Sequence, residues 1–155
     1  MNACVSIVTP SLNQARFLEL AVESVLQQEC DFLEYWVVDG GSEDGSVDLL
    51  RQYDSRLRWV SEPDSGQGDA INKGFQRSRG EIIGWLNADD VYCPGALNEV
   101  AGQFRSNPDL MLLYGKAHHV DENGNFLEVY PTRDFELDAL AYHCFICQPA
   151  CFFRR

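Results

Sequence analysis

The sequence predicts an α/β fold in which a mostly parallel sheet carries helices on both faces. Short apolar segments rich in β-branched residues alternate, through residue 107, with segments whose apolar residues recur at spacings of three and four. This alternation is typical of parallel strands joined by crossover helices. The chain has 155 residues, of which 45% are hydrophobic. That is enough for one domain with a substantial core.

Four strands and four helices are predicted from the sequence up to residue 108. The first strand is expected at residues 3–10, ending at Pro10, and the first helix at 13–28, with Asn13 as its N-cap. The apolar face of this helix consists of Phe17, Leu18, Ala21, Val22, Val25 and Leu26. Further strands are expected at 32–41, 57–63 and 80–87, and further helices at 43–53, 65–78 and 94–108.

The second half is less regular. A fifth strand is expected at 109–120, and a hairpin at 121–131 with its turn at Asn123–Gly124. A short surface helix at 134–143 and a half-buried, alternating strand within 144–153 complete the pattern.

Composition excludes some functions. Twenty-four acidic and twelve basic residues give a net charge of −12, so a basic face that binds nucleic acid is not expected. An anionic ligand would have to be held by a metal ion or by local groups. Residues 2–10 lack the basic region of a signal peptide, and no apolar run reaches the ~20 residues of a membrane span. These features predict a cytoplasmic protein with reduced thiols.

Three cysteines lie close together near the end of the chain. Cys144, Cys147 and Cys151 follow His143, but the C-x2-C-x3-C spacing lacks the distant second ligand pair of common zinc sites. Buried cysteines acting as small hydrophobic residues are the favoured interpretation. The alternative is a metal site built from these cysteines.

Polar groups follow each of the first four expected strands. They are Thr9-Pro10-Ser11, Asp39-Gly40-Gly41, Glu62-Pro63-Asp64 and Asn87-Ala88-Asp89-Asp90. The carboxyl ends of parallel strands meet at one edge of a sheet, where ligands of such folds bind. Asp89 and Asp90 are suited to Mg²⁺ or Mn²⁺, which prefer oxygen ligands. The alternative is a solvated turn whose aspartates cap the next helix.

Asp39 stands alone between its strand and two glycines. Its carboxylate is suited to accept a hydrogen bond from a base or a sugar hydroxyl, because glycines allow a flat ligand to approach closely. A turn aspartate is the alternative. His118 and His119 are adjacent and face opposite sides of a strand, so we expect no shared metal ligation and no catalytic role.

Four segments in this order resemble the donor-binding, N-terminal portion of family 2 glycosyltransferases, which have the GT-A, Rossmann-like fold. They are "VSIVTPSLNQARFLELAVESVLQQ", "WVVDGGSEDGS", "EPDSGQGDAINKGFQRSRGEIIGWLNADDVYCPGAL" and "QPACFFRR". The resemblance covers nearly the whole chain. It implies one domain over 1–155, with a nucleotide-binding half at 1–107 and the start of an acceptor-side half at 108–155.

The resemblance also implies an activity. It is inverting transfer of a sugar from a nucleotide-diphosphate donor, usually a UDP-sugar, to an acceptor hydroxyl in polysaccharide or glycoconjugate synthesis. The acceptor would be a carbohydrate or a glycolipid, the latter bringing the protein to a membrane surface. Asp89 would hold Mn²⁺ or Mg²⁺, and Asn87 stands where many relatives carry a first aspartate. The donor would contact Thr9, Pro10, Asp39, Asp69, Asn72, Lys73, Asn87 and Asp90.

In this family the general base lies beyond the "QPACFFRR"-like strand, so the resemblance implies a chain truncated before its base, which follows Arg155. Asp134, Glu136 and Asp138 are expected on a surface helix and are not assigned this role. A nucleotide-sugar-binding fragment without catalysis is the alternative. A metal phosphatase or phosphotransferase is a third reading. It is disfavoured because no aspartate directly follows the first strand.

Overall fold

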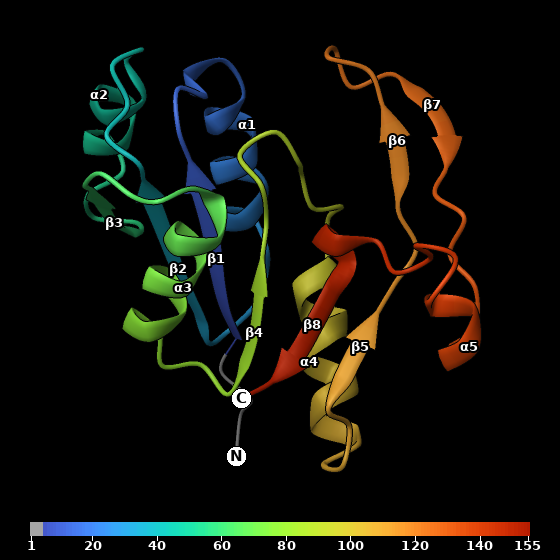
Figure 1. The fold of residues 1–155 in the computed structure, drawn as a ribbon. Coiled ribbons are helices and arrows are strands. Elements are labelled where there is room, and N and C mark those ends of the chain that lie inside the picture. The colour runs from blue at the N-terminus through green and yellow to red at the C-terminus, as the bar shows by residue number, and fades with distance from the viewer. Residues whose placement is uncertain (1–4) are drawn as a thin grey trace.

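A computed structural model of the chain describes residues 5–155, and its main sheet has six strands in the order β3-β2-β1-β4-β8-β5 (Figure 1). The first four strands pair in parallel, which confirms the expected α/β class. They are β1 (Val5–Ser11), β2 (Leu33–Asp39), β3 (Arg58–Ser61) and β4 (Ile82–Trp85). Residues 3 and 4 of the expected first strand lie outside the described residues.

The last strand, β8 (Cys151–Arg154), lies antiparallel between β4 and β5 (Leu112–Tyr114). The alternating pattern of 144–153 predicted a longer strand, and that prediction is wrong at its start. A 3₁₀ turn, η1 (Gln148–Ala150), precedes β8. Pro149 has no backbone N–H to give to a ladder, so the strand begins after it.

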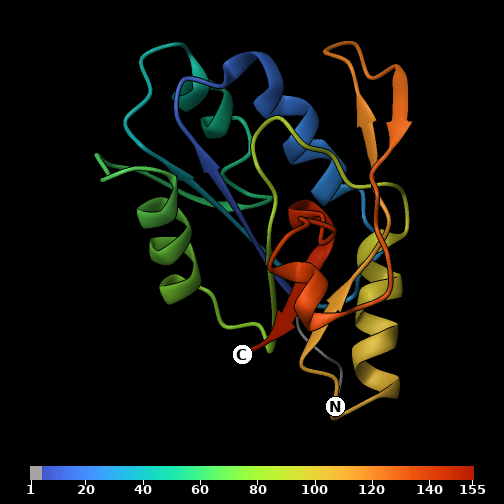
Figure 2. The same ribbon diagram turned by 45° about the vertical axis from the view of Figure 1, so that its right-hand side comes forward.

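Helices cover both faces of the sheet, as expected. On one face α1 (Ala15–Leu26), α2 (Ser46–Arg51) and α4 (Ala96–Ser106) bury their apolar sides in the larger core cluster. On the other face α3 (Gln67–Arg77) packs Ala70 against Val8 and Val38 (Figures 1 and 2). Successive side chains of a strand point to opposite faces of the sheet, and this decides which cluster each residue joins. In β1, Val5 and Ile7 belong to the larger cluster and Val8 belongs to the smaller one.

The start of α1 differs from expectation. Asn13 is not its N-cap; Gln14 holds that position without a side-chain bond. The Ala15 backbone N–H donates to the Asp44 carboxylate at 2.8 Å, and the Asn13 side-chain oxygen accepts from the Glu43 N–H at 2.9 Å. The loops after β1 and β2 are therefore tied together at the carboxyl edge of the sheet.

The segment expected as one strand at 109–120 is two strands in two sheets. β5 ends at Tyr114, whereas β6 (His118–Val120) pairs only with β7 (Phe126–Val129) in a hairpin that stands apart from the main sheet (Figure 1). The expected hairpin turn is confirmed, with Gly124 at a φ of 81°. The expected helix at 134–143 is only α5 (Leu137–Leu140).

No helix formed within residues 5–155 has both the length and the apolar character needed to cross a membrane.

Candidate functional site

A cleft of ≈ 320 Å³ opens at the carboxyl edge of the sheet. Its walls are formed by the end of β1, the end of β4 and the start of α3. Three segments that are distant in the sequence therefore meet at the cleft. Its lining consists of Pro10, Ser11, Leu12, Gln14, Asp64, Gly66, Gln67, Ala70, Asn87, Ala88 and Asp89. Of the residues expected to bind a donor or a metal, the structure brings Pro10, Asn87 and Asp89 into this cleft.

The loop after β4 is held by its own polar side chains. The Asn87 amide nitrogen donates to Asp90 at 3.2 Å and to Gln148 at 2.9 Å, and the Asn87 oxygen accepts from Gln67 at 2.9 Å. Asn87 is thus fully engaged, while the exposed Asp89 is the carboxylate that projects from the loop. Burial, and then the negative charge of Asp89, raise the pKa of Asp90, although the Asn87 hydrogen bond opposes the shift.

The donor set decides which kind of metal site is feasible. Within residues 5–155 no group of three or more His, Cys, Asp or Glu side chains is arranged to hold an ion. Mg²⁺ commonly takes only one or two protein carboxylates, with substrate phosphates and waters completing its shell. An exposed Asp89 at the cleft, with Asp90 beside it, fits an ion shared with a diphosphate. It does not fit an ion enclosed by protein alone.

Thr9 and Asp39 are buried below the cleft and do not line it. The Thr9 hydroxyl is hydrogen-bonded to the Tyr35 hydroxyl at 2.9 Å. The Asp39 carboxylate is fully buried and accepts from the Gly41 and Ser42 N–H groups and from the Ser42 and Ser61 hydroxyls. Asp39 thus serves the fold through four hydrogen bonds, three of them to Oδ2 and one to Oδ1, and contact of Thr9 or Asp39 with a base stays a prediction.

The three expected residues of α3 also lie outside the lining of the cleft. Lys73 Nζ is 3.1 Å from Asp69 and donates to the Pro63 carbonyl at 3.0 Å. Hydrogen bonds from the Ser65 N–H and from Lys73 lower the pKa of Asp69. Asn72 is exposed on the helix surface. Lys73 is thus partly neutralised where it stands.

Ser11 and Asp64 are two of the lining residues that were not among the expected ligands. Ser11 is 5% exposed, and no group among residues 5–155 is hydrogen-bonded to its hydroxyl. Asp64 also lines the cleft and is half-buried. Both belong to the polar groups that follow strands, so their position was predictable. Their hydrogen-bonding state was not.

A second, larger cavity of ≈ 1000 Å³ adjoins the first at Asp89. It is a groove between α1, the loop 89–94 and the β6–β7 hairpin, which stands beside α1 in Figure 2. Its lining includes six carboxylates, and it includes no Lys or Arg among the described residues. The carboxylates belong to Glu23, Asp89, Asp90, Asp121, Glu122 and Glu128.

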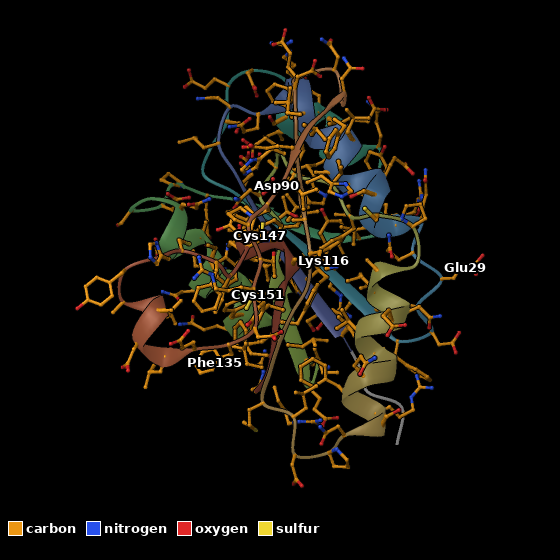
Figure 3. All side chains as sticks on the ribbon, turned by 90° about the vertical axis from the view of Figure 1, so that its right-hand side faces the viewer. Glu29, Asp90, Lys116, Phe135, Cys147 and Cys151 are labelled. Atoms are coloured by element: carbon orange, nitrogen blue, oxygen red, sulfur yellow. The ribbon has the colours of Figure 1, made fainter. Side chains whose placement is uncertain are left out.

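The C-terminal cysteines only partly follow the expectation of burial. Cys147 is buried and Cys151 half-buried, but Cys144 is exposed, which corrects the prediction for that residue. Burial, and then the charge of Asp90, raise the pKa of the Cys147 thiol. Figure 3 shows Asp90 and Cys147 close together, with Cys151 farther along the chain. Cys147 thus packs behind the acidic loop as a protonated thiol.

The chain has the GT-A fold, in which a ligand cleft lies at the carboxyl edge of a mostly parallel sheet. Solved structures of this fold cover nearly the whole chain. *Staphylococcus aureus* TarS 1–349 with UDP-GlcNAc has a TM-score of 0.74 at 20% identity over 97% of this chain and 45% of that one. The mannosyltransferase PcManGT of *Pyrobaculum calidifontis*, with GDP-Man and Mn2+, has a TM-score of 0.74 at 21% identity over 100% of this chain and 45% of that one.

The sequence model of Glycosyl transferase family 2 matches residues 6–155, and the chain belongs to this family. An uncharacterized glycosyltransferase of *Nostoc* is 33% identical over 76% of this chain and 36% of its own length. Chondroitin synthase of *Escherichia coli* is 32% identical over 79% of this chain and 18% of its own. A PGL/p-HBAD biosynthesis glycosyltransferase of *Mycobacterium tuberculosis* is 33% identical over 97% and 59%. The chain thus spans between about a fifth and three fifths of these relatives.

Proposed function

We propose that this chain is the donor-binding part of an inverting glycosyltransferase that takes a sugar from a UDP-sugar. The acceptor is the hydroxyl of a carbohydrate or glycolipid in cytoplasmic polysaccharide or glycoconjugate synthesis. One observation carries the proposal: Asp89 lines both cavities. A donor in the smaller cavity and an acceptor in the larger one would therefore meet at this carboxylate.

The smaller cavity suits the nucleoside diphosphate. Pro10 and Leu12 offer apolar surface, and the polar groups of Gln67, Asn87 and Asp89 stand at the other side. Asp89 would hold Mn²⁺ or Mg²⁺, which when bound neutralises the charge that develops on the departing diphosphate. Asn87 orients the neighbouring Asp90 by donating to it. The role of these residues is to hold the donor with its anomeric carbon toward the groove.

The larger cavity suits an uncharged acceptor. Arg16 pairs with Glu122 and Arg56 with Glu23, but carboxylates still outnumber the cations around this groove, and the excess would repel a phosphorylated or sulfated chain. Leu20, Val91 and Leu127 expose apolar surface in the same lining. A neutral sugar attached to an apolar group matches both features. This favours a glycolipid acceptor at a membrane surface.

Attack by the acceptor hydroxyl on the anomeric carbon displaces the diphosphate in one step, which inverts the configuration at that carbon. A carboxylate must take the hydroxyl proton. Asp134, Glu136 and Asp138 are exposed around α5 and line neither cavity, so we assign this base to none of them. The chain spans only part of its relatives and is expected to bind the donor nucleotide but to transfer sugar poorly by itself.

Calorimetric titration with UDP, with and without Mn²⁺, tests the assignment of the donor site. We expect binding that requires the metal and that Asp89→Ala weakens on the order of 100-fold, since even indirect metal contacts are worth 10- to 100-fold. Asp109→Ala is the matched control, because Asp109 is exposed in the connection between α4 and β5. Equal UDP binding without metal, or an unaffected Asp89→Ala variant, would contradict the proposal.

A further inference from the structure

We propose that Gln148 is a positioning residue for the acidic loop after β4: it fixes the orientation of the Asn87 side-chain amide and, through it, the place of Asp90. The inference rests on the proposed function, because this loop forms part of the proposed donor site. Gln148 itself lines neither of the two cavities, so it acts on the donor only through other residues.

Gln148 is anchored on the main sheet. It lies in η1, directly before β8, and its Nε2 donates to the Trp85 carbonyl at 2.6 Å. The β4–β8 ladder ends at Gly84, so this bond adds the last residue of β4 to the connection between the two strands. A carbonyl oxygen can only accept a hydrogen bond. The amide nitrogen of Gln148 therefore faces Trp85, and its oxygen faces away.

The Asn87 amide takes its orientation from Gln148. Its Nδ2 donates to Gln148 Oε1 at 2.9 Å, because only the NH₂ group of Asn87 can meet an oxygen there. The same nitrogen donates to the Asp90 carboxylate at 3.2 Å, and Asn87 Oδ1 accepts from Gln67 Nε2 at 2.9 Å. The reversed amide would set Oδ1 against two acceptors, Gln148 Oε1 and the Asp90 carboxylate. All three bonds therefore require the same orientation.

Gln67 does not decide this orientation. It is exposed, and within residues 5–155 its side chain makes no hydrogen bond besides the one to Asn87, so its amide can turn to suit either orientation of Asn87. Gln148 is half-buried, and both ends of its amide are engaged. The direction of the Asn87 amide is thus set by a residue 61 positions later in the chain.

The orientation matters because two carboxylates follow Asn87. Asp89 and Asp90 repel each other when both are ionised. Within residues 5–155 the Asp90 carboxylate accepts its one side-chain hydrogen bond from Asn87. Without Gln148 the Asn87 amide would be free to rotate, and Asp90 would lose the donor that holds it in place beside Asp89.

The first test needs no ligand and follows the side-chain amide protons of Asn87 by nitrogen–proton correlation spectroscopy. We expect them to exchange with water at least about tenfold more slowly than those of the exposed Asn72, because both are hydrogen-bonded. Gln148→Met, which has similar size but no amide, should raise the rate to that of Asn72. Gln148→Asn, too short to reach both Trp85 and Asn87, should do the same. Gln67→Ala is the matched control and should leave these protons protected.

The second test asks whether Gln148 acts through Asn87. In titrations with UDP and Mn²⁺, Gln148→Met should weaken binding by about tenfold, the low end of the range for outer partners of metal ligands. In a chain that already carries Asn87→Ala, the same change should weaken binding by less than about twofold, because the contact is already lost. Tyr130→Phe is the control for the fold. It removes a hydrogen bond to the Cys144 carbonyl in the same C-terminal segment and should leave UDP binding unchanged.

Two results would overturn the role of Gln148 and leave the donor site standing. One is an Asn87 amide that exchanges equally slowly in Gln148→Met and Gln148→Asn. The other is an effect of Gln148→Met on UDP binding that adds in full to the effect of Asn87→Ala. An unaltered chain that binds no uridine nucleotide would overturn the proposed function instead, and the exchange of the Asn87 protons would still decide the role of Gln148.

Discussion

Asp39 illustrates how a carboxylate placed beside a ligand cleft can serve the fold. It ends β2, and its four donors come from the turn 41–42 and from Ser61 at the end of β3. The side chain therefore joins two strand ends and the turn between β2 and α2. The edge on which the cleft is built depends on this connection.

Replacing Asp39 should affect stability before it affects recognition. We expect Asp39→Ala to lower the free energy of unfolding by about 3 kcal/mol, because several buried donors lose their acceptor. Urea unfolding followed by tryptophan fluorescence measures the change, with Glu43→Ala as the exposed control. A variant of unchanged stability that bound UDP more weakly would instead indicate that Asp39 contacts the donor.

Of the residues that the sequence predicted at the strand ends, some line the cleft and others do not, for a definite reason. Pro10, Asn87 and Asp89 lie in the cleft because they follow adjacent parallel strands. Asp39 and Asp64 follow strands in the same way. Whether each carboxylate is available to a ligand depends on other residues: Asp39 accepts from the Ser61 hydroxyl, 22 residues away, and Asp64 occupies the space above Gly40. Sequence patterns do not show which carboxylates are already hydrogen-bonded within the fold.

At the scale of elements, the approach of α3 to β1 depends on a glycine. A Cβ on Gly74 would overlap Val8 Cγ1 and lie 2.8 Å from Val8 Cγ2. The helix can lie this close to the sheet only because position 74 has no side chain. Since α3 forms one wall of the cleft, the same contact positions Gly66 and Gln67 at its mouth.

Gly74→Ala should therefore destabilise the protein although alanine is the better helix former. We expect a loss of about 1–3 kcal/mol from overpacking, against a gain of at most about 1 kcal/mol from helix propensity. Gly102→Ala in α4 is the matched control, because among residues 5–155 an added Cβ there meets no atom within 4 Å outside its own helix backbone and chain neighbours. That variant should gain about 0.5–1 kcal/mol. Thermal unfolding of both variants measures these stability changes. A Gly74→Ala variant that is more stable than the unaltered chain would refute the close contact between α3 and Val8.

The regular elements were predictable and the irregular ones were not. Short β-branched runs indicated β1 to β4 and apolar spacings of three and four indicated α1 to α4, because their apolar residues are buried in the core clusters on the two faces of the sheet. The segment 109–120 has no comparable pattern, and its division between two sheets depends on β8 pairing with β5 only as far as Tyr114. That pairing comes from residues nearly 40 positions later.

For the whole molecule, the excess of acidic groups makes pH a natural probe. Glu34 is a carboxylate that joins several segments: it accepts from Ser6, from the Arg79 N–H, from Trp36 and from Arg58. Burial by itself raises the pKa of Glu34, but these hydrogen bonds and the charge of Arg58 outweigh it and lower the pKa. The ionised form is thus favoured by folding.

Because the folded pKa of Glu34 is lowered, its contribution is complete above the unfolded value of about 4.3 and is lost as the pH falls through the folded value. We expect Glu34→Gln to lower the free energy of unfolding by about 1–3 kcal/mol at pH 7, and the difference to vanish in strong acid. Glu29→Gln is the control, because Glu29 projects from the surface at the edge of the molecule (Figure 3). Urea titrations at several pH values measure both. A difference for Glu34→Gln that persisted below the folded pKa would contradict this account.

The place of β8 between β4 and β5 has a consequence for biosynthesis. On a translating ribosome, β1 to β4 can assemble as soon as they emerge, whereas β5 has no neighbour to join until Cys151–Arg154 has left the exit tunnel. The nascent chain therefore passes through a stage in which the residues of β5 are not yet paired in the sheet. Chaperones that hold such intermediates would act on this stage.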